Sequence, residues 1–92
     1  MDNSKSGTDR KSGDRLRPED EVKVIVIDDT GTLVYTYDAK GFHTLEDAAK
    51  TAFEASGIDS DIRDYTFRIT NLVTGTTARY RFNAHDHLHL IL

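Results

Sequence analysis

Residues 85–92 read HDHLHLIL, in which polar and aliphatic side chains alternate. Successive side chains of a β-strand point to opposite faces, so the three histidines (His85, His87 and His89) are expected on one face and the leucines on the other. The leucine face is suited to packing against a core. This stretch therefore predicts the final strand of a sheet.

Upstream of this stretch, the hydrophobic pattern predicts four more strands and one helix. Residues 22–27 are β-branched at every position except Lys23, and strand character returns at 33–37 after a turn at 28–31. These two segments form a predicted hairpin. Alternation at 65–70 and 77–82 predicts two further strands, with Arg79 and Arg81 on an outward face.

A helix is predicted over residues 45–56. Its apolar residues recur at helical spacing and form one stripe: Leu45, Ala48, Ala49, Ala52 and Phe53. Thr44 is a favourable N-cap, and Gly57 can adopt the left-handed conformation that ends a helix. The three alanines allow the helix to lie close to a sheet.

Composition divides the chain into two parts. Residues 1–21 hold five basic and six acidic residues and few large apolar ones, which predicts a disordered tail. Residues 22–92 are then the folded domain. The sequence contains no cysteine, which excludes disulfides and thiolate metal sites. It also lacks an apolar run long enough to span a membrane and a signal-peptide core, so we expect a cytoplasmic protein without membrane contact.

The charge balance argues against nucleic acid as a partner. The formal net charge is −4, and the seven basic residues of 22–92 are scattered among ten acidic ones. Nucleic-acid-binding domains usually carry a concentrated basic patch.

The order of two strands, a helix and further strands resembles the β-grasp fold of ubiquitin-like proteins. Residues 87–92 look like the Thr-Leu-His-Leu-Val-Leu of ubiquitin's last strand, which pairs beside the first strand in the centre of the sheet. The resemblance implies an α+β domain with a mixed four- to five-stranded sheet packed on one helix. It also places His89 and Ile91 at two positions of the surface with which ubiquitin binds its partners.

Ubiquitin continues past this strand into an arm that ends in Gly-Gly and is conjugated to other proteins. The present sequence ends at Leu92 without such an arm. A covalent modifier whose C-terminal arm is missing is therefore an alternative function, and not the preferred one.

Two acidic motifs admit an enzymatic or calcium-binding interpretation. Residues 28–33 read DDTGTL, similar to the phosphorylated-aspartate motif of haloacid-dehalogenase-type phosphotransferases. That chemistry needs a parallel sheet and further acidic ligands, whereas here a second strand follows at hairpin distance. Residues 59–64 resemble a calcium loop, but the required glycine and glutamate are replaced by Asp64 and Thr70. We therefore predict no catalytic residues and no cofactor.

The histidines suggest a second alternative. Imidazoles two residues apart on one strand face can share a zinc, copper or nickel ion, so His85, His87 and His89 form a candidate metal site. An exposed polar sheet face is the simpler interpretation.

The preferred prediction is a non-enzymatic protein-interaction module. A single helix covers only one face of a sheet, so the other face is expected to remain open. If Val22, Val24 and Val26 face the helix, the open face carries the candidate partner-binding residues Ile25, Ile27, Val34, His89 and Ile91. The opposite assignment would expose the valines instead. The expected occupant is a protein partner or a second copy of the chain.

Overall fold

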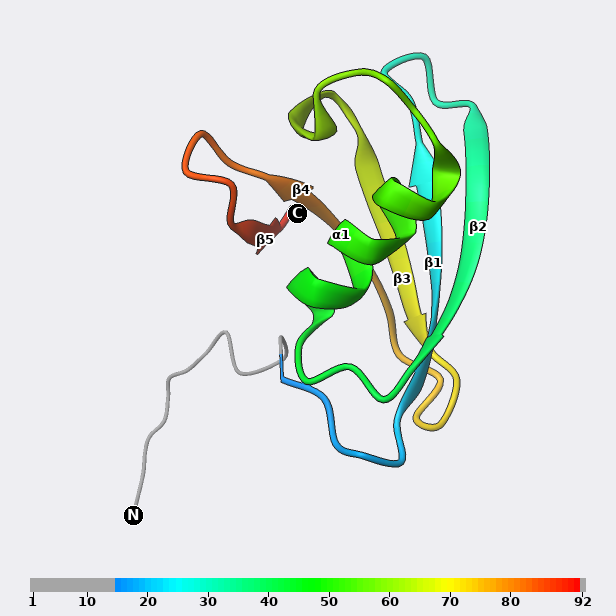
Figure 1. Cartoon of the computed structure of the whole chain (residues 1–92). Helices are drawn as coiled ribbons and strands as arrows, with labels where there is room; N and C mark the ends of the chain where they lie inside the picture. Colours follow the sequence, from blue (N-terminus) through cyan, green and yellow to red (C-terminus); the bar gives the residue numbers. More distant parts are fainter. Residues whose placement is uncertain (1–14, 92) are drawn as a thin grey trace.

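The computed structural model describes residues 15–91, which form a five-stranded antiparallel sheet with one helix on one of its faces (Figure 1). The elements are β1 (Glu21–Ile27), β2 (Leu33–Lys40), α1 (Leu45–Ser56), the short 3-10 helix η2 (Ile62–Asp64), β3 (Thr66–Asn71), β4 (Thr77–Phe82) and β5 (Leu88–Leu90). The predicted α+β class, with one helix packed on a sheet, is therefore confirmed.

The strand order is β2-β1-β3-β4-β5, and each neighbouring pair is antiparallel. The layers are compatible with a β-grasp fold, but the pairing differs from the expected one in two respects. The sheet is antiparallel throughout and not mixed, and β3 lies beside β1 where the resemblance implied the last strand. The connection at 83–87 is short, so β5 folds back on β4 as a hairpin and lies at the sheet edge.

Helix α1 has the bounds that the sequence predicts. Thr44 caps its first turn, because the Asp47 N–H donates to the Thr44 hydroxyl at 3.1 Å. Gly57 ends the helix with φ 74°, a left-handed conformation that glycine adopts without a steric penalty. The predicted apolar stripe of α1 is buried.

The core lies between α1 and the sheet. Val22, Val24 and Val26 of β1 are fully buried, which settles which face of β1 meets the helix. Phe67 of β3 is also fully buried, and its ring packs edge-on against Phe82 with the centroids 5.4 Å apart. This aromatic packing adds specific contacts to the area that the valines bury.

The ordered domain begins before residue 22. Residues 1–14 of the predicted tail lie outside the described residues, whereas 15–21 are placed against the domain. The Leu16 N–H donates to the His43 carbonyl at 2.8 Å, and Leu16 packs on the core. Asp20 is buried and Glu21 begins β1. The prediction of disorder is therefore wrong for 15–21, because Leu16 and these polar contacts compensate for the low apolar content.

In the part of the chain that the structure describes, no helix combines the length and the apolar character needed to cross a membrane.

Candidate interaction surface

The face of the sheet opposite α1, here called the free face, is defined by the strand register. Ile25 of β1 lies opposite Thr36 of β2 and opposite Arg68 of β3. Arg68 in turn lies opposite Arg79 of β4. These residues alternate with the buried residues of their strands, so they share the face that α1 leaves uncovered.

The structure places the predicted partner-binding residues at the two sides of this free face. Ile25 and Ile27 lie on β1, and both are half-buried. The strand pairing shifts between Val26 and Ile27, which leaves Val34 of β2 as an extra residue, 41% exposed. The exposed apolar surface therefore lies at Val34 and the adjacent Leu33, which is 53% exposed, more than at the two isoleucines.

His89 and Ile91 lie on the other side, next to β4. His89 is opposite Arg81, and the Ile91 N–H donates to the Arg79 carbonyl at 3.0 Å. Two whole strands, β3 and β4, separate this side from Ile25 and Ile27. The predicted residues therefore do not form one continuous apolar patch.

Three arginines occupy the space between the two sides. Arg68 of β3 and Arg79 and Arg81 of β4, here called the arginine cluster, are all exposed. Like charges directly opposite each other in a sheet are unfavourable, so the Arg68–Arg79 pair costs stability. A feature that costs stability on an open face is a candidate for function.

Arg81 is anchored at one end of the cluster. Its guanidinium donates to the Arg63 carbonyl of η2 at 2.9 Å. The Arg63 guanidinium itself pairs with the Asp61 carboxylate at 2.8 Å, which lowers the pKa of Asp61 to about 2. The positive charge of Arg63 is thus compensated locally, and Asp61, which lies in the segment that resembles a calcium loop, caps η2.

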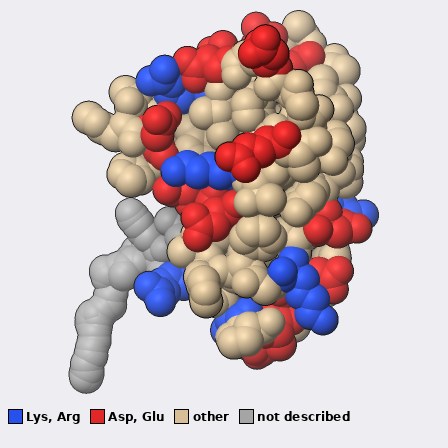
Figure 2. Space-filling model, viewed as in Figure 1, with Lys and Arg blue, Asp and Glu red and all other residues tan. Residues whose placement is uncertain are grey.

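The helix side of the molecule has the opposite charge character. Figure 2 shows this side, where acidic residues predominate over basic ones around the helix. Helix α1 contributes Glu46 and Asp47 in its first turn and no basic residue in its last turn. The arginine cluster therefore gives the free face a charge that differs from that of the helix side.

The candidate metal site is not assembled. Only His89 lies in β5, whereas His85 and His87 belong to a turn in which both their N–H groups donate to the Asn83 side-chain oxygen, at 2.9 and 3.1 Å. Asp86 within this turn has φ 63°. The prediction that the three histidines share one strand face is wrong, because the turn breaks the alternation. Residues 15–91 contain no group of three metal-ligating side chains that could hold an ion.

The start of β5 is fixed to the helix by Glu46. Its carboxylate accepts from the Leu88 N–H at 3.0 Å and from the Lys50 ammonium at 3.2 Å. Burial raises the pKa of Glu46, but these two donors outweigh it, so the net pKa lies below its usual value. This contact holds the short edge strand β5 against the domain.

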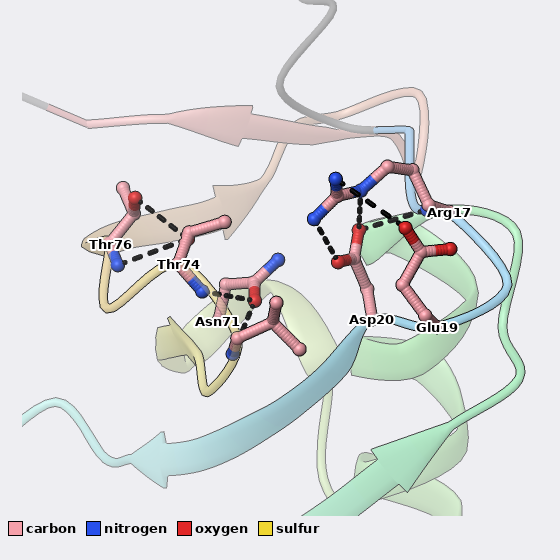
Figure 3. Close-up of polar contacts among 7 residues, drawn as sticks. Arg17, Glu19, Asp20, Asn71, Thr74 and Thr76 are labelled. Atoms are coloured by element: carbon pink, nitrogen blue, oxygen red, sulfur yellow. Dashed lines mark hydrogen bonds and ion pairs between the residues drawn. The ribbon is translucent and has the colours of Figure 1, made fainter.

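Just before β1, Arg17 and Asp20 form a compact ion pair, with the guanidinium Nη2 2.8 Å from the Asp20 carboxylate (Figure 3). This contact lowers the pKa of Asp20 to about 2. Figure 3 also shows Asn71, whose side-chain oxygen accepts the Thr74 N–H at 3.1 Å in the β3–β4 turn. A cavity of about 210 Å³ lies between residues 15–16 and this turn, on the helix side and away from the free face.

The DDTGTL segment forms the predicted turn. The Asp28 carboxylate accepts the Thr30 hydroxyl at 2.6 Å and the Thr32 N–H at 2.9 Å. These bonds stabilise the ionised carboxylate, so the pKa of Asp28 lies below its usual value. The bond from the Thr30 hydroxyl has the largest effect. The carboxylate that the phosphotransferase interpretation would need is engaged within its own hairpin.

The sequence predicted an outward face for Arg79 and Arg81, and the same alternation applies to Arg68, but none of the three was assigned to the site. The alternation within each strand was sufficient to orient them. What was missing is the register that sets Arg68 opposite Arg79, which depends on strand pairing.

Comparison with known proteins gives no relative: no family model, no curated protein and no solved structure matches the chain.

Proposed function

We propose that this protein is a non-enzymatic interaction module that binds a protein partner through the free face of its sheet. The observation that carries the proposal is the Arg68–Arg79 pair, two like charges held opposite each other on a face that α1 leaves open. Such a pair is unfavourable within the isolated chain. Exposed Leu33 and Val34 adjoin the face on its other side.

The polar groups that could have served catalysis support a structural role instead. Asp28 is bonded within a turn, Asp61 pairs with Arg63, and Glu46 holds β5 to α1. These carboxylates lie on separate elements. A catalytic site needs a nucleophile, a base and a charge-stabilising group that converge on one point.

The resemblance to ubiquitin-like proteins also favours a binding role for the free face. It extends to the layered arrangement and to the alternation around His89, and not to the strand order. We therefore propose a ubiquitin-like mode of use, a sheet face that binds proteins, without proposing the receptors of ubiquitin itself.

The proposal is tested by site-specific photo-crosslinking in the source cell. A photoreactive residue at Thr36 or Thr77, both exposed on the free face, is expected to give an adduct with one discrete protein. The same residue at Asp47 or Glu54, exposed on α1, serves as the matched control and is expected to give none. An adduct of twice the chain mass would identify the partner as a second copy.

The double substitution Ile25→Lys and Ile27→Lys adds a second test. It places charge beside the partner while leaving the buried valines of β1 in place, so the adduct is expected to disappear and the fold to remain, as checked by circular dichroism. Adducts that form from α1 and not from the free face would refute the proposal.

A further inference from the structure

We propose that the arginine cluster binds an acidic segment of the partner, with a carboxylate placed between Arg68 and Arg79. This inference rests on the proposed function and adds the chemistry of the partner. It follows from the register, from the absence of a counter-charge among residues 15–91 and from the residues that flank the pair.

The register brings two guanidinium groups to one place. Arg68 and Arg79 are direct cross-strand partners, and Cβ atoms in such pairs lie only about 5 Å apart. Both side chains are exposed and emerge on the free face. A carboxylate has two oxygens, and the planar guanidinium matches it with two parallel hydrogen bonds, so one carboxylate can accept from both arginines.

Residues 15–91 supply no anion for this pair. Within residues 15–91, neither Arg68 nor Arg79 forms an ion pair or a side-chain hydrogen bond, whereas Arg17 pairs with Asp20 and Arg63 with Asp61. Across the strands, the residue beside Arg68 is Ile25 of β1 and the residue beside Arg79 is Ile91, which follows β5. Both are uncharged. The two charges are thus uncompensated within the described residues, and we place the carboxylate that compensates them on the partner.

The flanking residues define the rest of the ligand. Ile25 and Ile91 lie on either side of the two arginines, and Ile27 continues the apolar side toward Leu33 and Val34. A segment that carries acidic and aliphatic side chains together would satisfy both features. A purely acidic segment would leave the apolar sides of the face uncovered.

The same observations favour a protein over a nucleic acid. Single-stranded nucleic acids are bound by aromatic side chains on which the bases stack. Here Tyr35, Tyr37 and Tyr80 pair in register with buried residues of the helix side and do not lie on the free face. The net charge of −4 also disfavours attraction of a polyanion over long distances.

The test uses fluorescence anisotropy with a labelled peptide of alternating Glu and Val residues, and the full chain. We expect binding that weakens as salt increases, and none to a matched Gln–Val peptide. Arg68→Gln and Arg79→Gln should each weaken binding roughly tenfold or more, because each removes charge-assisted hydrogen bonds. Arg68→Lys keeps the charge but loses the planar fork, so an intermediate loss is expected.

Lys50→Gln is the matched control, because it removes one positive charge from α1 on the other side of the sheet. It should leave peptide binding unchanged. Equal binding by the wild-type chain and both arginine variants would overturn the inference, as would equally tight binding of labelled single-stranded DNA. Self-association that Arg68→Gln abolishes would identify a second copy as the occupant and also overturn it. Absence of peptide binding together with free-face crosslinks in the cell would refute this inference and leave the proposed function standing.

Discussion

Across β1 and β2, the charged residues of the free face lie opposite charges of the other sign: Lys23 is opposite Asp38, and Glu21 is opposite Lys40. Across β3 and β4, Arg68 lies opposite Arg79. The two strand pairs belong to one sheet and one face. Their difference shows that strand pairing in this molecule can place compensating charges, and that β3 and β4 do not do so.

The stability of the sheet comes from its other face. Val24 and Phe67 are fully buried beneath α1, while Ile25 and Arg68, one residue further along each strand, are on the free face. Burial of one large apolar side chain contributes more than a cross-strand ion pair. The buried face can therefore offset the cost of the arginines, which leaves the free face available for the proposed binding.

The largest difference in stability is expected between substitutions of the neighbouring residues Phe67 and Arg68. Phe67→Ala removes a fully buried ring that packs against Phe53 and Phe82, and should lower the free energy of unfolding by about 3–5 kcal/mol. Arg68→Ala should leave stability unchanged or slightly higher. Urea unfolding of both variants measures the difference, and similar losses for both would contradict the assignment of faces.

A smaller effect on stability is expected from the Arg17–Asp20 pair, in which an arginine does have a carboxylate partner. The pair lowers the pKa of Asp20 to about 2, from an ordinary value of 3.8. Its contribution to stability is thus fully present above about pH 4 and is lost as the pH falls toward 2. Asp61, whose pKa is also about 2, acts in the same range.

Asp20→Asn separates these contributions. The difference in unfolding free energy between wild type and this variant should shrink as the pH is lowered from 6 to about 2. A difference that stays constant over this range would show that the Asp20 charge does not contribute.

Substitutions that change the sign of one charge can make the Arg68–Arg79 pair favourable and the Lys23–Asp38 pair unfavourable. Arg79→Glu should stabilise the domain by about 0.2–1 kcal/mol, and Asp38→Lys should destabilise it by a similar amount, because each changes the sign of a cross-strand pair. Both shifts should decrease in high salt. Thermal unfolding at two salt concentrations measures them, and a loss of stability in Arg79→Glu would contradict the unfavourable pairing.

Added zinc should have the smallest effect. Because His85 and His87 lie in the Asn83 turn and not on the strand of His89, zinc should not change the melting temperature. Calorimetry with and without zinc measures this, and a substantial rise would restore the metal-binding interpretation.

The sequence predicted those parts of the fold that depend on neighbouring residues. The bounds of α1 follow from Thr44, Gly57 and the apolar stripe, and the assignment of Val22, Val24 and Val26 to the core follows from alternation. The prediction failed at 85–87, where the Asn83 side chain organises a turn within a stretch that alternates like a strand.

The pairing between distant strands also could not be predicted from the sequence. Strand β2, helix α1 and η2 separate β1 from β3 in the chain, and no local pattern specifies that Ile25 will lie opposite Arg68. The register between β3 and β4 brings Arg68 and Arg79 together, and the register between β1 and β3 places Ile25 beside them. The residues of the face were therefore foreseen individually, and their arrangement was not.

The most direct test of the free face as the binding surface is a residue-resolved NMR titration of the full chain with the Glu–Val peptide. Amide signals should shift along the row formed by Ile25, Arg68, Arg79 and Ile91, while those of α1 remain in place. Shifts confined to α1 or to the cavity near residues 15–16 would contradict the account.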